Sequence, residues 1–364
     1  MSITCGELYD FIDSQFPFAL QESWDNSGLL VGSREQDADK VLLTLDITSS
    51  VVREANALGA QLIISHHPVI FRPLASLSPD DVPYQLAQAG IAALCMHTNF
   101  DIATGGLNTA LAARLGLADT CPLHVTAREA YKKIVVFVPK GHEDAVYRAM
   151  AQAGAGCVGA YDGCAFFGEG MGSFRPLEGA QPFIGTPGEQ EQTPEVRIEM
   201  VCAPAKIGTV IRAMRAAHPY EEPAFDILTT DALYEENGLG QIGTLQTAMD
   251  PRAFARFVKE KLQAGGVRVS AGNRPVLTVA VCGGSGGDEL MRAVHAGADA
   301  YVTGDVKHHE WLLAREYGIT LIDAGHFSTE NQAIPVLRKL LDDTFGNRAE
   351  FLLSETCTDP AEFI

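Results

Sequence analysis

Four short segments of this chain concentrate histidines and carboxylates. They are "SHHP" (65–68), "HTNFD" (97–101), "TGDVKHHE" (303–310) and "GHFSTE" (325–330). In the first segment His66 and His67 follow an apolar run and precede Pro68, which restricts the residue before it to extended or turn geometry. We therefore predict that a core strand ends here and that both imidazoles can turn toward one point.

The other three segments each offer several polar side chains. They contribute His97, Asn99 and Asp101, then Asp305, His308, His309 and Glu310, and finally His326 and Glu330. His326 and Glu330 are four residues apart, so they face the same way if a helix begins at Ser328.

Each segment taken alone also has a plainer interpretation. Two neighbouring histidines can be one surface and one packed side chain, "HTNFD" can be a turn, "KHHE" can be the exposed start of a helix, and H-x-x-x-E can be a solvated pair. A shared site is favoured because all four segments follow a predicted parallel strand. Open α/β sheets bind ligands in the crevice beyond the carboxyl ends of such strands.

Imidazoles together with carboxylates suit borderline divalent metals, namely zinc, iron, manganese or nickel. Three histidines and two carboxylates are too many for one metal that keeps an open position. They fit two metals that share a bridging carboxylate, and such a pair can activate a water molecule.

Apolar runs that alternate with helical segments must position these residues. We predict a strand within each of the segments 40–48, 61–68, 91–101, 275–286, 299–311 and 315–330, followed by a polar or glycine loop in the last four, with a helix end opening 315–330. Helices are predicted at 49–60, 83–90, 104–117 and 287–298. This alternation predicts parallel strands covered by helices on both faces. A Gly-Ala pair recurs at 59–60 and 297–298, which suggests two similar three-layer α/β/α halves.

The middle of the chain has a different pattern. Residues 128–240 read as strand, helix, two strands, helix and strand, the order of a ferredoxin-like α+β module. We therefore predict a first α/β half at 1–127, an inserted domain at 128–240 and a second α/β half at 241–364.

Bulk composition narrows the class of protein. The chain has 364 residues and a net charge of −19, which argues against nucleic acid as a partner. It shows no evident signal peptide or membrane span, and its eight cysteines form no C-x-x-C pair. These features predict reduced thiols and a cytoplasmic location.

Five segments in fixed order resemble a known family. "ESWDNSGLLVG" (22–32), followed by "SHHP", "HTNFD", "TGD" and "GHFSTE", resembles the NIF-three-like family. Its members are named dinuclear-metal-centre hexameric proteins or GTP cyclohydrolase 1 type 2 homologues. The middle of the chain resembles the insertion of the longer bacterial members, and "HPYEEPAFDI" (218–227) is similar to part of CutA-like and PII-like modules.

The resemblance implies two divalent metal ions per subunit. The residues that match the family's ligands are His66, His67, Asp101, His326 and Glu330, with Glu330 as the bridge. His97 would support a ligand or transfer a proton, and Asp46, Asp305 and His308 are weaker candidates. One departure is Gln241, where the family pattern leads us to expect arginine.

The resemblance also implies a toroidal homohexamer and a hydrolase. The reaction would be opening of the guanine ring of GTP at a C–N bond, or hydrolysis of a phosphoester, on a small-molecule substrate such as a nucleotide. The alternative is a non-enzymatic metal-binding or regulatory scaffold. The glycine run "CGGSGG" (282–287) could cradle an anion or be a plain turn.

Overall fold

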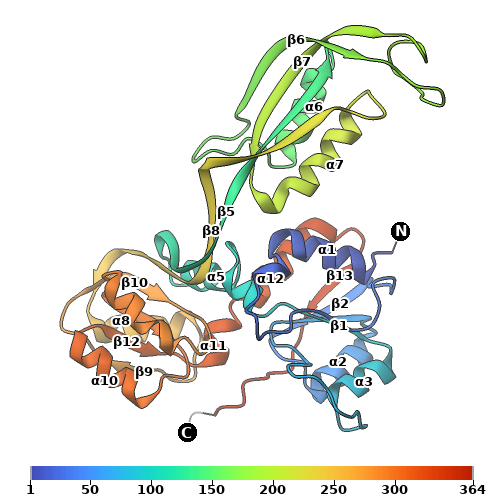
Figure 1. Ribbon diagram of the computed structural model, residues 1–364. Helices are drawn as coiled ribbons and strands as arrows, with labels where there is room; N and C mark the ends of the chain where they lie inside the picture. Colours follow the sequence, from blue (N-terminus) through green and yellow to red (C-terminus); the bar gives the residue numbers. More distant parts are fainter. Residues whose placement is uncertain (1, 363–364) are drawn as a thin grey trace. The chain divides into compact units, whose positions relative to one another are not determined.

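The chain folds into two compact units. The computed structural model describes residues 2–362. The first unit combines residues 1–127 with 237–364, and the second consists of residues 128–236 (Figure 1). The chain thus leaves the first unit once, builds the second, and returns.

A five-stranded sheet forms one half of the first unit. Its strands are β1 (Gly28–Val31), β2 (Lys40–Thr44), β3 (Leu62–Ser65), β4 (Ala92–Cys95) and β13 (Glu350–Leu353), in the order β1-β4-β3-β2-β13. All neighbours are parallel except the β1–β4 pair. Residues 350–353 therefore belong to the first sheet, so the prediction that placed them in the second half was wrong.

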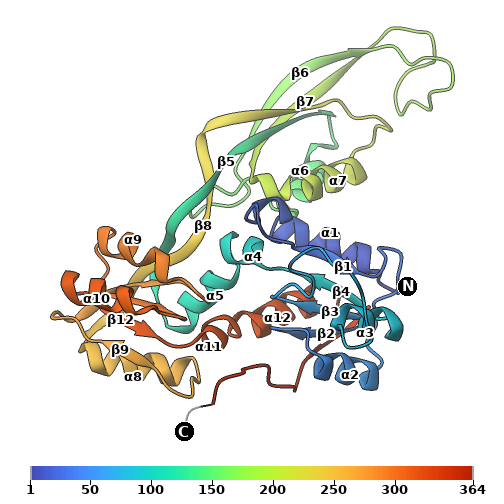
Figure 2. The ribbon, with the colours of Figure 1, turned by 60° about the horizontal axis from the view of Figure 1, so that its bottom comes forward.

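Helices cover both faces of this sheet. Helices α2 (Ser49–Leu58) and α3 (Val82–Ala89) lie on one face, and α1 (Cys5–Gln15) and α12 (Ala333–Phe345) on the other (Figure 2). Successive side chains of a strand point to opposite faces. Leu42 accordingly packs with α2 and α3, whereas Val41 and Leu43 pack with α1 and α12. Burial on both faces explains why these strands read as unbroken apolar runs.

A second sheet forms the other half of the first unit. Strands β10 (Val276–Val281), β11 (Ala300–Thr303) and β12 (Thr320–Asp323) are parallel, and β9 (Arg268–Ser270) and β8 (Phe225–Met249) flank them in antiparallel orientation. Helices α5 (Leu107–Arg114) and α8 (Pro251–Lys261) cover one face, and α9 (Leu290–His295) and α10 (His308–Tyr317) the other.

The structure confirms the predicted mixed α/β class and corrects the strand directions. The predicted parallel strands are present in both halves, but the flanking strands β1, β8 and β9 run antiparallel to their neighbours. Strands β1 and β9 are less buried than the central strands, so they lack the fully buried environment of the parallel core. No helix within residues 2–362 has the length and apolarity needed to cross a membrane.

The second unit contains two helices and four strands. Strands β5 (Ala118–Pro139) and β8 enter it from the first unit, and it adds α6 (Glu143–Gln152), β6 (Ala165–Phe174), β7 (Glu191–Cys202) and α7 (Ile207–Ala217). The strand order is β6-β7-β5-β8, and both helices pack on this sheet through one apolar core. A likeness of this unit to CutA or PII proteins stays a prediction.

Gly304, just after β11, offers a test of how tightly the second half holds the neighbouring loops. A Cβ atom there would lie 2.7 Å from the backbone nitrogen of His326 and 2.9 Å from the carbonyl oxygen of Gly284. Backbone atoms cannot swing aside, so we expect Gly304→Ala to lower the free energy of unfolding by about 1–3 kcal/mol. Chemical denaturation measures this difference.

The matched control is Gly170→Ala on β6, where a Cβ would meet no atom within 4 Å. Equal stability of the Gly304 variant and the wild type would contradict the close approach.

Candidate metal centre

The ends of three parallel strands bring the predicted ligands together. Strand β3 leads into His66 and His67, β4 leads into α4 (Thr98–Ile102), which carries Asp101, and β12 leads into α11 (His326–Glu330). The helix begins at His326, two residues before Ser328. The four-residue spacing still places both side chains on one face, with His326 Nε2 3.1 Å from Glu330 Oε2.

Glu330 lies between three imidazoles. Its Oε1 is 3.6 Å from His66 Nε2, and its Oε2 is 3.2 Å from His67 Nε2. Asp101 Oδ1 lies 3.7 Å from His66 Nε2 on the same side. One oxygen of Glu330 thus faces a group with His66 and Asp101, and the other faces a group with His67 and His326. This is the arrangement that a carboxylate bridging two cations requires.

Every histidine of the cluster has its Nδ1 engaged away from the centre. His66 Nδ1 lies 2.8 Å from the Met96 carbonyl oxygen, and each of the other three lies 2.7 Å from a carboxylate oxygen: His67 with Asp46, His97 with Asp25, and His326 with Asp305. These oxygens only accept hydrogen bonds, so each Nδ1 carries the proton. In the neutral rings the lone pair is therefore on Nε2, which is the protonation pattern of metal-binding histidines.

Several buried polar atoms in the cluster have no hydrogen-bond partner among the described residues. They are His66 Nε2 and Asp101 Oδ1, and Glu330 Oε2 is a third. A buried polar atom left unpaired costs about 1–3 kcal/mol, and divalent cations bound among these atoms would satisfy all three. The donor set, three imidazoles and two carboxylates, also fits such a cation.

The charges of the cluster support the same interpretation. Burial lowers the pKa of His67, but hydrogen bonds with Asp46 and Glu330 outweigh it and raise that pKa to about 10. Burial raises the pKa of Glu330, but the neighbouring imidazoles, His66 first, hold it well below its usual range. Without metal, protons on the histidines balance the carboxylates, and a divalent cation would replace those protons.

His97 lies close enough to take part directly. Its ring centroid is 5.2 Å from that of His66 and 5.5 Å from that of His67. The candidate ligand atoms of His66, His67 and His97 all lie within 4.8 Å of one another. The same holds for a second group, His67, His326 and Glu330. The geometry therefore permits ligation by His97 as well as the predicted proton transfer.

Asp25 is a functional candidate that the sequence pattern did not single out, although it lies in the segment 22–32. Its carboxylate is fully buried and accepts hydrogen bonds from His97 Nδ1, from the Thr98 backbone nitrogen at 3.0 Å and from the Thr98 hydroxyl at 2.5 Å. Burial raises the pKa of Asp25, but these bonds prevail and depress it. Asp25 and His97 are 72 positions apart, so no local motif joins them.

The segment 303–310 contributes only Asp305 to the cluster, through His326. His308 and His309 are exposed on the first turn of α10, and buried Glu310 accepts a hydrogen bond from the Lys307 backbone nitrogen at 2.7 Å. The structure does not bring His308 into the cluster, because α10 begins at this residue and presents it to solvent.

The glycine run 282–287 makes room for Glu330. A Cβ on Gly284 would collide with Glu330 Oε1. The Gly283 and Gly284 backbone nitrogens already donate to Asn108 Oδ1 at 2.9 Å and Thr329 Oγ1 at 3.0 Å. These two N–H groups are used internally, so the plain-turn interpretation fits better than an anion cradle.

Fold and site together define an α/β protein with a candidate metal centre at its strand ends. The family model described as Duf34/NIF3 (NGG1p interacting factor 3) matches residues 3–360. The chain belongs to the NIF3 family.

Relatives and solved structures agree with this membership. A Bacillus subtilis protein named "GTP cyclohydrolase 1 type 2 homolog" is 40% identical over 100% of this chain and 99% of its own. A Halalkalibacterium halodurans protein of the same name is 39% identical over 100% of both chains. The crystal structure of a Bacillus cereus protein related to NIF3 is 38% identical, covers 100% of both chains and has a TM-score of 0.85.

Removal of the central carboxylate should empty the site. We expect Glu330→Ala to lose most bound metal, because both groups of ligands share this side chain. Elemental analysis of protein purified without a histidine tag measures metal per chain.

His308→Ala is the matched control, since it removes an exposed histidine of the same unit, and it should keep wild-type metal content. Circular dichroism shows whether both variants fold. Equal metal in the folded Glu330 variant and the wild type would contradict the assignment.

Proposed function

We propose that this protein is a hydrolase that uses two divalent metal ions per chain. The proposed ligands are His66, His67, Asp101, His326 and Glu330. The observation that carries the proposal is the buried Glu330 carboxylate, whose two oxygens face different sets of ligand atoms. Zinc, iron, manganese and nickel all suit these donors.

The ligand count favours chemistry over a structural role. Five side chains cannot close the coordination of two metals, and open positions are typical of catalytic sites. When bound, such metals lower the pKa of a coordinated water so that hydroxide forms near neutral pH.

His97 would handle the proton. Asp25 holds Nδ1 of the ring, which leaves Nε2 toward the cluster to accept a proton from water and return it to a leaving group. Three hydrogen bonds keep the Asp25 carboxylate ionised and fixed, so the imidazole keeps one orientation. Asp25 is thus a positioning residue for His97.

Two exposed aromatic side chains beside His97 suggest the substrate class. Trp24 is 58% exposed and Phe71 is 46% exposed, with ring centroids 5.9 Å apart. Their centroids lie 6.0 Å and 6.3 Å from that of His97. Large aromatic rings left open to solvent beside a polar site offer stacking surfaces for a planar ring. We infer a substrate with a nucleobase.

A purine nucleotide hydrolysed at a C–N bond, as in ring opening of GTP, satisfies these features. The names of the relatives point the same way. Phosphoester hydrolysis of a nucleotide is the alternative reaction. A cavity of about 470 Å³ that borders His326 and Asp305 offers space beside the centre. The toroidal homohexamer stays a prediction, which light scattering of the purified protein tests.

Activity should depend on metal and on His97. We expect GTP incubated with the metal-loaded protein to gain one water, detected by mass spectrometry. A chelator should abolish the reaction and added metal should restore it. His97→Gln should lower kcat by about 10²–10⁴-fold, the usual contribution of a general acid–base group. Full metal occupancy without hydrolysis of GTP or phosphoesters would instead favour the scaffold alternative.

The exposed rings of Trp24 and Phe71 should mainly affect the affinity for substrate. We expect Trp24→Ala to raise KM about 5- to 100-fold, since stacking of a base contributes about 1–3 kcal/mol, and to leave metal content unchanged. Tyr317→Ala, which removes a 53% exposed aromatic ring on α10, is the control and should not change KM. An unchanged KM in the Trp24 variant would exclude stacking on this ring.

A further inference from the structure

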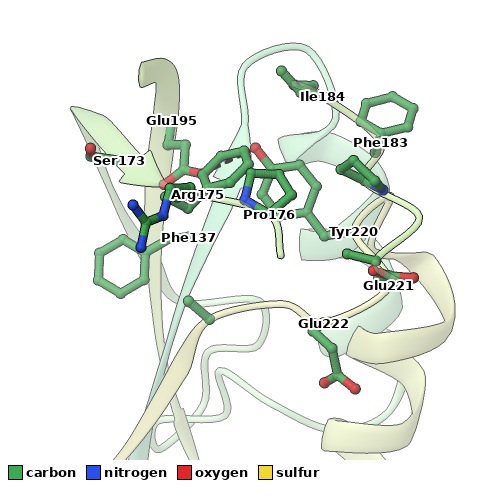
Figure 3. A pocket seen from close by; sticks show the side chains of 14 residues that line it. Phe137, Ser173, Arg175, Pro176, Phe183, Ile184, Glu195, Tyr220, Glu221 and Glu222 are labelled. Carbon is green, nitrogen blue, oxygen red and sulfur yellow. Dashed lines mark hydrogen bonds between the residues drawn. The ribbon is translucent and has the colours of Figure 1, made fainter. Parts of the chain in front are cut away.

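The second unit contains a cavity of its own. It has a volume of about 240 Å³, and strands β5 and β7 and the segments 173–184 and 220–224 line it (Figure 3). The side chains that matter for its chemistry are Phe174, Phe183, Glu195, Tyr220, Glu221 and Glu222. All of them lie within residues 128–236, so this cavity is formed by one unit alone.

Tyr220 is the centre of an aromatic wall. Its ring centroid lies 5.8 Å from that of Phe174 and 6.3 Å from that of Phe183. The backbone nitrogen of Tyr220 donates to His218 Nδ1 at 3.0 Å, and buried His218 donates from Nε2 to the Phe137 carbonyl oxygen at 3.0 Å. These bonds fix the backbone at Tyr220 before any ligand arrives.

A carboxylate is fixed at the same wall. The Tyr220 hydroxyl donates to Glu195 Oε1 at 3.2 Å. Burial and this carboxylate raise the pKa of Tyr220 to about 12, so the hydroxyl remains a donor. On β6, Gly172 leaves space where a Cβ would collide with the Glu195 carboxylate. Strand and aromatic ring together orient this group.

Negative charge predominates around the cavity. Glu195, Glu221 and Glu222 line it, against a single cation, Arg175 (Figure 3). Glu221 Oε1 accepts a hydrogen bond from the Gln181 backbone nitrogen at 3.0 Å. Within residues 2–362 none of the three carboxylates has a lysine or arginine nitrogen within 4.0 Å. Their negative charge is therefore not neutralised by a direct ion pair, and a positive ligand would meet it.

We propose that this cavity binds a small organic cation that carries an alkylammonium group. Aromatic faces attract such a cation through their quadrupole, and rings combined with carboxylates are the usual means of recognising it. An anion would meet three carboxylates against one guanidinium, that of Arg175, and a neutral apolar molecule would leave the carboxylates without a role. The proposal does not depend on the metal centre or on hydrolysis.

Choline and its neutral isostere 3,3-dimethylbutan-1-ol are the probes, since they share a shape and differ in charge. Saturation-transfer NMR and calorimetry on the full chain measure binding. We expect choline to bind at least about fivefold more tightly than the isostere, the lower end for a partly desolvated cation–π contact.

Variants locate the site. Glu195→Gln keeps a hydrogen-bond acceptor for Tyr220 and removes the charge, and Tyr220→Leu removes the aromatic face. Both should weaken choline binding about five- to thirtyfold. Phe166→Leu, which changes a 63% exposed ring of the same unit outside the cavity, is the control and should bind as the wild type does.

Three outcomes would overturn the proposal. One is equal binding of choline and its isostere, which would show that charge is not recognised. Another is wild-type affinity in both Glu195→Gln and Tyr220→Leu, which would place choline elsewhere. The third is that neither choline nor tetramethylammonium binds at concentrations up to about 20 mM, because a Kd above that value would be too weak for specific recognition.

Discussion

The buried carboxylate of Glu330 is the constraint on which the centre depends. An ionised group inside a protein is stable only if it is paired and hydrogen-bonded. Glu330 is 4% exposed and meets this requirement through imidazoles contributed by the ends of two different sheets. Glu330, whose buried charge needs these imidazoles, therefore links the two α/β halves at one point.

A second set of carboxylates stands behind the imidazoles. Asp25, Asp46 and Asp305 each hold the Nδ1 of one histidine. This arrangement does two things at once, since it fixes the ring and increases the basicity of the nitrogen that faces the centre. These three carboxylates add to the negative charge of Glu330 and Asp101. The larger total charge favours binding of divalent cations over protonation of the histidines alone.

Much of this could be predicted from the sequence, because strand ends and i,i+4 spacing are local properties. The apolar runs before His66 and His97 located the strands, and the spacing of His326 and Glu330 placed both on one helix face. What escaped prediction was non-local. Asp25 meets His97 across 72 positions, and β13 returns from the end of the chain to pair with β2. His308 was considered as a candidate but lies outside the cluster for a different reason. It is at the start of a helix, where a polar residue can face solvent as easily as a site.

The position of β13 has a consequence for how the chain is made. Strand β2 pairs with β3 on one side and with β13 on the other, and β13 is the last strand within residues 2–362. During synthesis β2 would therefore be an open edge, with unpaired N–H and C=O groups, until residue 353 leaves the ribosome. Open edges invite pairing with other chains. The sheet of the first half is complete only after the inserted unit and the second half have been synthesised. A truncated chain that lacks β13 would therefore expose an unpaired, aggregation-prone edge on β2 as well as an incomplete metal centre.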